Sequence, residues 1–146
     1  MIKTFKGKVA DSTITKIRLS TNNGMVGYQV RKLQLFPSKF GTHDQESTVA
    51  LFSVEPAAAD AELNFDDPTL LAAACLSTDN SEANPLNSNV IIDSKKVNQD
   101  IWLTHEDVHP DSRPVNYYVE LEQMKLDLNQ NTMATLKDIR NETLAI

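Results

Sequence analysis

The sequence has few of the residues on which several classes of protein depend. Its 146 residues include one cysteine, Cys75, so no internal disulfide can form. Only four glycines are present, and none lies in a glycine-rich phosphate-binding motif. No apolar run approaches the roughly 20 residues that span a bilayer, and the lysine-rich N-terminus lacks the apolar stretch of a secretory signal. We therefore expect a protein synthesised in a cytoplasm, without disulfides, cofactors or membrane contact.

The charge of the chain is unevenly distributed. Residues 1–18 carry five basic side chains against Asp11, a net charge of +4, which leaves −10 for the rest of a chain whose total is −6. A negative total disfavours sequence-independent nucleic-acid binding, because such binding depends on neutralising phosphates. A basic N-terminal arm, residues 1–18, would suit docking on an acidic surface of a neighbour or of another copy. The favoured interpretation is nevertheless an ordinary solvated edge strand whose lysines oppose aggregation.

Two long stretches carry the clearest strand pattern. In residues 25–36 and again in residues 117–128, apolar side chains alternate with polar ones, and the phase of the alternation slips once. The slips fall at Arg31-Lys32 and at Glu122-Gln123. Because a one-residue offset turns every later side chain to the opposite face, each slip predicts a β-bulge.

These patterns predict a mainly β fold, a β-sandwich or jelly roll of about seven or eight antiparallel strands. The turn residues Asn22-Asn23-Gly24 predict a hairpin that joins residues 13–19 to residues 25–36. Strands do not alternate with long helices, which argues against an α/β fold. At 146 residues we expect one β-sandwich domain, residues 1–146.

Two short helices are predicted, near residues 67–76 and 131–141. For the first, Asp66-Asp67-Pro68 offers an N-cap followed by proline, and Cys75 is predicted to be a buried, unreactive thiol. The second is an amphipathic C-terminal helix that packs either on its own domain or on a neighbouring subunit. Its apolar residues recur at threefold spacing: Met133, Leu136 and Ile139.

The candidate metal-binding groups have a plainer interpretation. His105-Glu106-Asp107-Val108-His109 places two imidazoles four residues apart. Pro110 follows at once and only His43 remains as a further histidine, so a solvated loop is favoured over a zinc site. The oxygen-rich runs Asp66-Asp67 and Asp79-Asn80-Ser81-Glu82 lack the glycine and the distal glutamate of a calcium loop. No metal is predicted.

The candidate catalytic and stacking residues are weighed in the same way. Glu120 and Glu122 lie two apart on one strand face, but the nearby Lys125 favours an exposed charged face over acid/base catalysis. No serine or cysteine stands in a nucleophile motif, so the protein is not expected to be an enzyme. Four aromatic residues could stack on sugars or bases, although their strand positions favour core or interface packing: Tyr28, Trp102, Tyr117 and Tyr118.

Four segments resemble one protein family. They are GYQVRKLQLFP at 27–37, VNQDIWLTH at 97–105, NYYVELEQMKLDL at 116–128 and ATLKDIRN at 134–141. Together they are similar to small virion structural proteins of marine tailed bacteriophages, including phages that infect cyanobacteria. The four segments comprise 41 of the 146 residues, and residues 55–88 show no resemblance.

The resemblance implies a non-enzymatic component of the virion on the capsid exterior, without cofactor or catalytic residue. We expect a capsid decoration or cement protein that binds the major capsid protein or other virion proteins and stabilises the head, and a homo-oligomer is compatible with this role. The alternatives are a carbohydrate-binding β-sandwich for host attachment and a tail or baseplate structural protein. The residues predicted to contact a partner are Lys3, Lys6, Lys8, Met133, Leu136 and Ile139.

Overall fold

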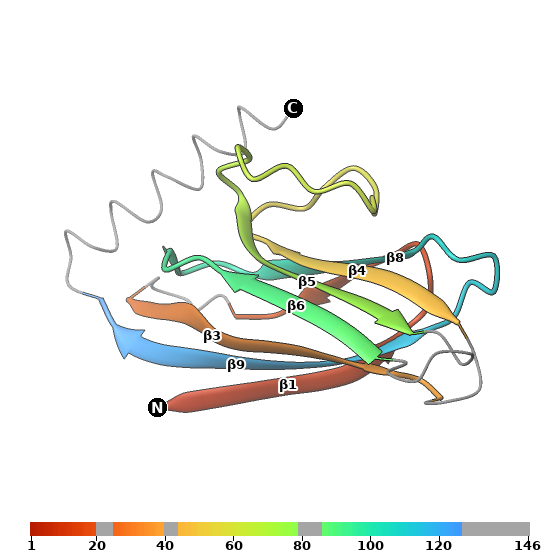
Figure 1. The fold of residues 1–146 in the computed structure, drawn as a ribbon. Coiled ribbons are helices and arrows are strands. Elements are labelled where there is room, and N and C mark those ends of the chain that lie inside the picture. The colour runs from red at the N-terminus through yellow and green to blue at the C-terminus, as the bar shows by residue number, and fades with distance from the viewer. Residues whose placement is uncertain (20–24, 40–43, 79–85, 127–146) are drawn as a thin grey trace.

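The computed structural model describes residues 1–19, 25–39, 44–78 and 86–126 (Figure 1). Within these ranges the chain forms two antiparallel β-sheets and no helix, which confirms the prediction of a mainly β protein. The strands are β1 (Ile2–Val9), β2 (Thr13–Ile17), β3 (Val26–Pro37), β4 (Gln45–Phe52), β5 (Leu70–Thr78), β6 (Leu86–Ile92), β7 (Lys96–Val97), β8 (Ile101–Asp107) and β9 (Val115–Lys125).

The strands are shared between two layers. One sheet has four strands in the order β1-β9-β3-β7, and the other has five in the order β2-β8-β4-β5-β6. In Figure 1 the four-stranded sheet forms the lower layer and the five-stranded sheet the upper one. Because most connections carry the chain from one sheet to the other, consecutive strands such as β1 and β2 are not neighbours.

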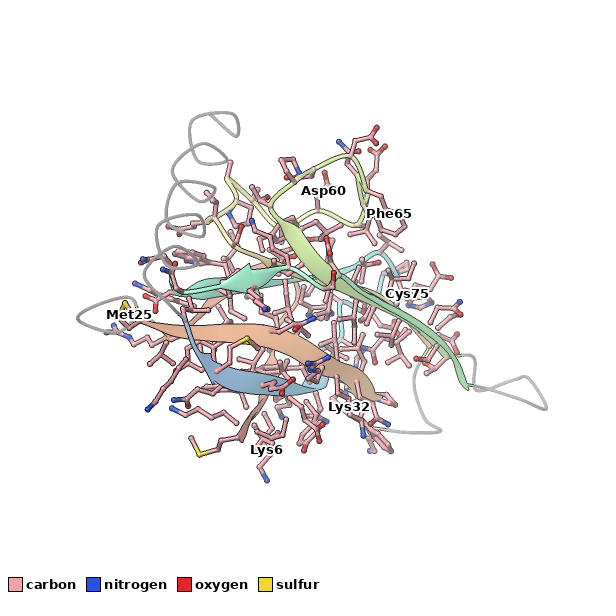
Figure 2. The ribbon with its side chains drawn as sticks, turned by 90° about the vertical axis from the view of Figure 1, so that its left-hand side faces the viewer. Lys6, Met25, Lys32, Asp60, Phe65 and Cys75 are labelled. Carbon is pink, nitrogen blue, oxygen red and sulfur yellow. The ribbon has the colours of Figure 1, made fainter. Side chains whose placement is uncertain are left out.

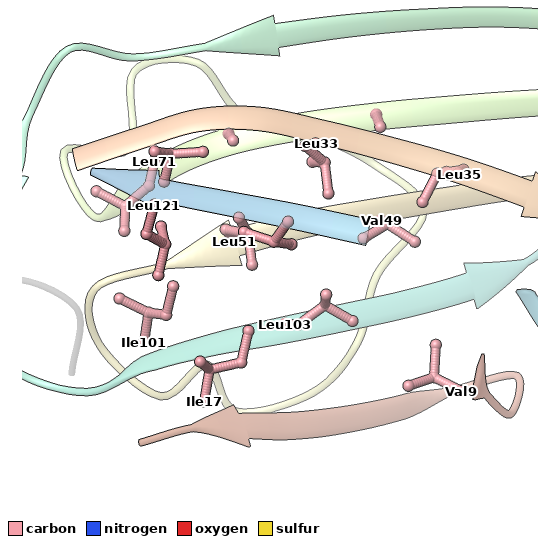
Figure 3. Packing of buried hydrophobic residues seen from close by; sticks show 14 of the residues in the cluster. Val9, Ile17, Leu33, Leu35, Val49, Leu51, Leu71, Ile101, Leu103 and Leu121 are labelled. Atoms are coloured by element: carbon pink, nitrogen blue, oxygen red, sulfur yellow. The ribbon is translucent and has the colours of Figure 1, made fainter. Parts of the chain in front are cut away.

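The hydrophobic core lies between the two layers (Figure 3). In the strands that contribute to it, alternate residues point into the core, as the period of two in a strand requires. In the central strand β4, Val49 and Leu51 face this core, and Ala50 between them is buried on the opposite face, so this strand is covered on both sides. The core side chains with the lowest exposure are Val49, Leu51, Leu71, Leu76, Ile101, Leu103, Val115, Val119 and Leu121.

The predicted bulge in β3 is present at Arg31. Val30 pairs with Leu121 of β9 and Lys32 pairs with Glu120, so Arg31 is the extra residue. Arg31 and Lys32 are both exposed, and Leu33 returns to the core. The bulge therefore keeps both halves of β3 facing one core, as the slip in the sequence indicated.

The predicted bulge in β9 at Glu122-Gln123 is wrong. β9 pairs with β3 without a shift from Lys125 to Leu121, and Gln123 lies opposite the buried Tyr28. Gln123 therefore takes an inward position although it is polar, and Met124 takes an outward one although it is apolar. The Gln123 Oε1 atom is buried, and no described residue donates a hydrogen bond to it. The slip in the apolar pattern reflects these two misplaced side chains and not an inserted residue.

The predicted helix at residues 67–76 is also wrong, because most of this segment is strand β5. β5 pairs along its length with β4 and with β6. Its three alanines, Ala72–Ala74, are all buried. Alanine favours helices in isolation, but pairing on both edges of a strand satisfies the same backbone groups and outweighs that preference.

Cys75 lies on this strand, and the prediction that it is buried is wrong. Its neighbours Ala74 and Leu76 point into the core, so Cys75 points to the outer face of the five-stranded sheet, where it is exposed. A helix would have placed the thiol among leucines, whereas the strand turns it away from them.

The predicted hairpin between residues 13–19 and 25–36 is not formed. β2 pairs with β8 in the five-stranded sheet, while β3 pairs with β9 and β7 in the four-stranded sheet. The connection therefore crosses between layers and does not fold two neighbouring strands onto each other. The predicted helix at 131–141, with Met133, Leu136 and Ile139, lies outside the described residues.

Candidate functional site

The outer face of the four-stranded sheet carries a groove across β1, β9 and β3. Its volume is about 530 Å³. We call it the basic groove, and it is lined by Lys6, Gly7, Lys8, Gln34, Leu35, Phe36, Asn116, Tyr117 and Tyr118. The pairing registers place these residues in adjacent cross-strand rows, although the three strands are far apart in sequence.

Strand register decides which side chains reach the groove. Lys6 lies opposite Tyr118, and Lys8 lies opposite Asn116. These residues alternate with Val9 and Val115, which point into the core, so the lysines face outward. The period of two therefore brings the predicted contact residues Lys6 and Lys8 together on one face.

Two aromatic rings stand in or beside the groove. Phe36 is 56% exposed at the end of β3. Tyr118 is held in place from two directions, because its hydroxyl donates a hydrogen bond of 2.8 Å to Glu120 Oε1 and the Lys32 ammonium lies 5.7 Å from its ring centroid. The hydrogen bond to Glu120, then burial and the negative charge of that carboxylate, raise the pKa of Tyr118. The phenol therefore stays neutral and fixed in orientation.

Gly7 gives Tyr117 room beneath this surface. A β-carbon at Gly7 would lie 3.0 Å from Tyr117 Cε1, closer than ordinary van der Waals contact. The ring thus covers the glycine across the strand pair, and its partial burial against the core raises the pKa of its hydroxyl. Tyr117 is a packing residue, as its strand position suggested, whereas Tyr118 reaches the outer face.

The third predicted lysine, Lys3, does not line the groove. It pairs with Leu121, whose side chain is buried, so it lies on the core-facing side of the edge strand. Its ammonium lies 5.8 Å from the centroid of the buried Tyr28 ring. The predicted basic arm, residues 1–18, consists largely of β1 and β2, and its lysines are divided between two faces.

Glu120 and Glu122 lie on the outer face beyond the groove, where each has its own partner. Glu120 accepts the hydrogen bond from Tyr118, and Glu122 forms an ion pair with the bulged Arg31. Both carboxylates are therefore engaged with groups of the sheet itself and form a charged row beside the groove.

His105 is not in a solvated loop, contrary to the expectation for residues 105–109. It belongs to β8, is 0% exposed and points between the sheets. Its Nδ1 lies 2.9 Å from the Ala10 carbonyl oxygen and its Nε2 lies 2.8 Å from Ser47 Oγ. The imidazole is therefore a packed, hydrogen-bonded group that joins β8 to β4 and to the β1–β2 turn.

His109 lies apart from this buried network, close to two carboxylates. Its Nε2 is 3.8 Å from Asp44 Oδ2 and its Nδ1 is 3.6 Å from Asp111 Oδ2. Among the described residues no three or more His, Cys, Asp or Glu side chains are arranged to hold a metal ion. His43 and residues 79–82 lie outside the described part of the chain.

Trp102 lies on the outer face of the five-stranded sheet, half-buried between neighbouring strands. It pairs with Lys16 on one side and Phe52 on the other, and the Lys16 ammonium lies 5.9 Å from its ring centroid. Lys16 also forms a 3.2 Å ion pair with Asp100. Trp102 therefore packs within its own sheet and does not join the tyrosines of the basic groove.

An acidic connection lies on the opposite side of the molecule from the groove. Residues 53–69, here called the acidic loop, join β4 to β5 and contain five carboxylates but no lysine or arginine. Figure 2 shows Asp60 and Phe65 of this loop at one end of the view and Lys6 and Lys32 at the other. A hollow of about 400 Å³ in the loop is lined in part by Glu55, Asp66 and Asp67.

The acidic loop is ordered by its own hydrogen bonds. Asp67 Oδ1 accepts bonds from both the backbone N–H and the hydroxyl of Thr69, and Asn64 Oδ1 accepts one from the backbone N–H of Asp66. Asp66-Asp67 thus begins a turn into β5. The Asp67 carboxylate therefore fixes the geometry of this turn.

Sequence reasoning missed Gln34, Phe36 and Asn116. Each occupies an outward position on a strand, and nothing in its local sequence marks it as part of a site. Only the register of β3 against β9, which includes the bulge at Arg31, places them beside Lys6 and Lys8. These three residues can be identified only from the correct strand register, and a period-of-two pattern alone does not give that register.

The chain matches no known family model and no curated protein. In the described part of the chain, no helix has the length and hydropathy required to cross a bilayer.

Proposed function

We propose that this chain is a non-enzymatic structural protein of a phage virion, a capsid decoration or cement protein that adds to the head surface in many copies and stabilises it. The resemblance of its strand segments to small virion proteins of marine phages supports the proposal. The observation that carries it is the basic groove, a hollowed, aromatic and lysine-bearing surface on a chain of net charge −6.

The connectivity of the strands supports a jelly-roll fold. In that arrangement eight strands alternate between two four-stranded sheets. Here β1, β9, β3 and β7 form one sheet and β2, β8, β4 and β5 begin the other, while β6 adds a ninth strand beside β5. Jelly rolls are frequent in viral capsid and lectin domains. The fold therefore fits a particle component, although a fold alone does not define a function.

The groove fits a protein partner better than a small-molecule substrate. It is open and shallow, and its polar groups are lysines and amides, which are suited to binding carboxylates and backbone carbonyls. Aromatic side chains are enriched at the centres of protein interfaces. Phe36 and Tyr118 occupy such positions between Lys6, Lys8 and Lys32. The partner in this proposal is an acidic surface within the virion.

Particles assembled with and without this protein test the proposal. The protein should be found on the heads of purified particles, and heads that lack it should release DNA at lower temperature or after a milder osmotic shock. Adding the purified protein back should restore resistance. A protein found only in the tail, or heads whose resistance is the same without it, would refute the proposal.

The second candidate function is carbohydrate binding. It is favoured by the exposed ring of Phe36, which lies near Tyr118 and two amide side chains. Aromatic faces stack on sugars, and Asn116 and Gln34 can both donate and accept hydrogen bonds. A glycan array screened with the protein and with Phe36→Ala tests it. Binding that is lost with Phe36→Ala but kept with Trp102→Ala supports a glycan site in the groove, and the absence of binding removes this candidate.

A further inference from the structure

Two charged surfaces in the described part of the chain have opposite sign and lie on opposite sides of the molecule (Figure 2). The basic groove and its margin carry Lys6, Lys8 and Lys32 on the outer face of the four-stranded sheet. The acidic loop projects from the far side of the five-stranded sheet. Its carboxylates are Glu55, Asp60, Glu62, Asp66 and Asp67. The molecule therefore carries opposite charge at the two ends of the axis that runs through both sheets.

The acidic loop also carries an exposed aromatic side chain. Phe65 is 64% exposed and is followed directly by Asp66 and Asp67. The hydrogen bonds that Asn64 and Asp67 make within the loop fix the backbone on both sides of this ring. An ordered loop that presents an apolar ring between carboxylates loses little conformational entropy when it binds.

The basic groove has the complementary features. It is hollowed, it contains the exposed Phe36 and the oriented ring of Tyr118, and lysines border it. A Phe65 ring placed in the groove would meet aromatic side chains, while the flanking carboxylates would meet ammonium groups. The hollow of the acidic loop, lined by Glu55, Asp66 and Asp67, is in turn suited to a lysine side chain.

We infer that the occupant of the basic groove is the acidic loop of a second copy of this chain. Two different surfaces meet in this contact, so it is heterologous and is repeated by each added copy. Because the two surfaces lie on opposite sides of one molecule, the copies stack head to tail in an open row. Each row leaves one groove and one loop free at its ends.

The inference rests on the proposed function only in treating the groove as a site for an acidic protein surface, and it is tested on the isolated full chain. Sedimentation equilibrium between about 1 μM and 1 mM covers the range expected for a weak contact. We expect the average mass to rise with concentration at 0.1 M salt. The rise should be much smaller at 1 M salt, where the screening length falls from about 10 Å to about 3 Å.

Charge reversal on each surface gives the decisive comparison. Lys6→Glu/Lys8→Glu reverses the groove, and Glu62→Lys/Asp66→Lys reverses the loop while leaving Asp67 to hold the turn. Each double variant alone should weaken self-association at least about tenfold, the loss expected for two charge pairs. An equimolar mixture should regain it, because the intact groove of the loop variant accepts the intact loop of the groove variant, and the reversed groove accepts the reversed loop. Circular dichroism and thermal melting confirm that each variant is folded.

A matched control keeps the charge change but avoids the groove. Lys3→Glu/Lys96→Glu alters two exposed lysines that do not line the groove, and self-association should remain within about twofold of the wild type. The inference is overturned if the wild-type chain stays monomeric over the whole range, if the groove variant associates as the wild type does, or if the mixture fails to regain association. A monomeric chain that still reinforces heads would overturn this inference while leaving the proposed function intact.

Discussion

The Nε2 atom of His105 lies 2.8 Å from the hydroxyl oxygen of Ser47, in the buried space between β8 and β4. The same hydroxyl oxygen is 2.7 Å from Gln45 Nε2, which donates a second bond to the Pro114 carbonyl. The Ala10 carbonyl oxygen can only accept, so His105 Nδ1 donates to it. His105 Nε2 can then accept a hydrogen bond from the Ser47 hydroxyl, whose oxygen accepts one from the Gln45 amide.

Replacing His105 should destabilise the fold without affecting the groove. His105→Ala removes a fully buried ring and leaves Ser47 and the Ala10 carbonyl without their partner, so the free energy of unfolding should fall by about 3 kcal/mol. Urea unfolding followed by tryptophan fluorescence measures the loss. Val108→Ala, at an exposed position on the same segment, is the control and should change stability by less than about 0.5 kcal/mol. A similar, small loss for both variants would contradict the buried network.

Asp107 should be a second stability determinant, because its carboxylate joins strand β4 to two positions of the connection between β8 and β9. Oδ1 accepts the backbone N–H groups of Glu46 and His109, and Oδ2 accepts that of Arg113. Asp107→Asn replaces one acceptor oxygen by a donor that faces an N–H, so we expect a loss of about 2 kcal/mol in chemical denaturation. Asp111→Asn on the same loop is the matched control. Equal stability of Asp107→Asn and wild type would show that these bonds contribute little.

The tyrosines of the four-stranded sheet should make stability fall at alkaline pH. The hydrogen bond to Glu120 raises the pKa of Tyr118, and burial raises that of Tyr117, both from an ordinary value of 10.0. A raised folded-state pKa gives stabilisation that is fully present below the unfolded value and is lost as the pH rises through the folded value. Unfolding measured from pH 8 upward should therefore show a decline that begins above about pH 10.

Removing the Glu120 charge isolates the contribution of Tyr118. In Glu120→Gln the phenol no longer faces a carboxylate, so its pKa should move back toward the value of free tyrosine. The ultraviolet absorbance of phenolate reports the titration. Glu122→Gln, whose carboxylate pairs with Arg31, is the control and should leave the titration of Tyr118 unchanged. Identical titrations in Glu120→Gln and wild type would rule out this origin of the shift.

The thiol of Cys75 should react in the native protein. It is exposed on the outer face of β5, so Ellman's reagent should modify it stoichiometrically without denaturant. Cys75→Ser should abolish the reaction and keep the native melting temperature, because the position contributes nothing to the core. A thiol that reacts only after unfolding would place Cys75 inside and contradict the strand register of β5.

Local patterns in the sequence predicted where the strands lie better than they predicted which strands pair with each other. The bulge at Arg31 could be predicted because Val30 and Leu33 are both apolar core residues on either side of it. The same argument failed in β9, where a polar residue, Gln123, takes a core-facing position. An alternation pattern reports hydrophobicity, and it misplaces a strand wherever a polar residue is buried or an apolar one is exposed.

The errors at residues 67–76 and at the predicted hairpin have a common physical cause. A capping signal and a turn signal are local, whereas strand pairing is decided by residues that are distant in sequence. Ala72–Ala74 form a strand because β4 and β6 lie on either side of them. The groove could be predicted only in part for the same reason. Lys6 and Lys8 stood out by charge, but Phe36 and Asn116 join them through pairing across about a hundred residues.

β1 and β9 are neighbours for their full common length, with Ile2 opposite Glu122 and Val9 opposite Val115. β9 also separates β1 from β3, so the four-stranded sheet cannot assemble before β9 is available. On the ribosome, β1 therefore waits for β9 before it finds its neighbour. Folding of such distant pairings is slow, because the entropy of closing a long loop is lost before the contacts form. The basic groove and the four-stranded side of the core should thus form only after β9 has emerged, and a nascent chain should have no groove for a partner until then.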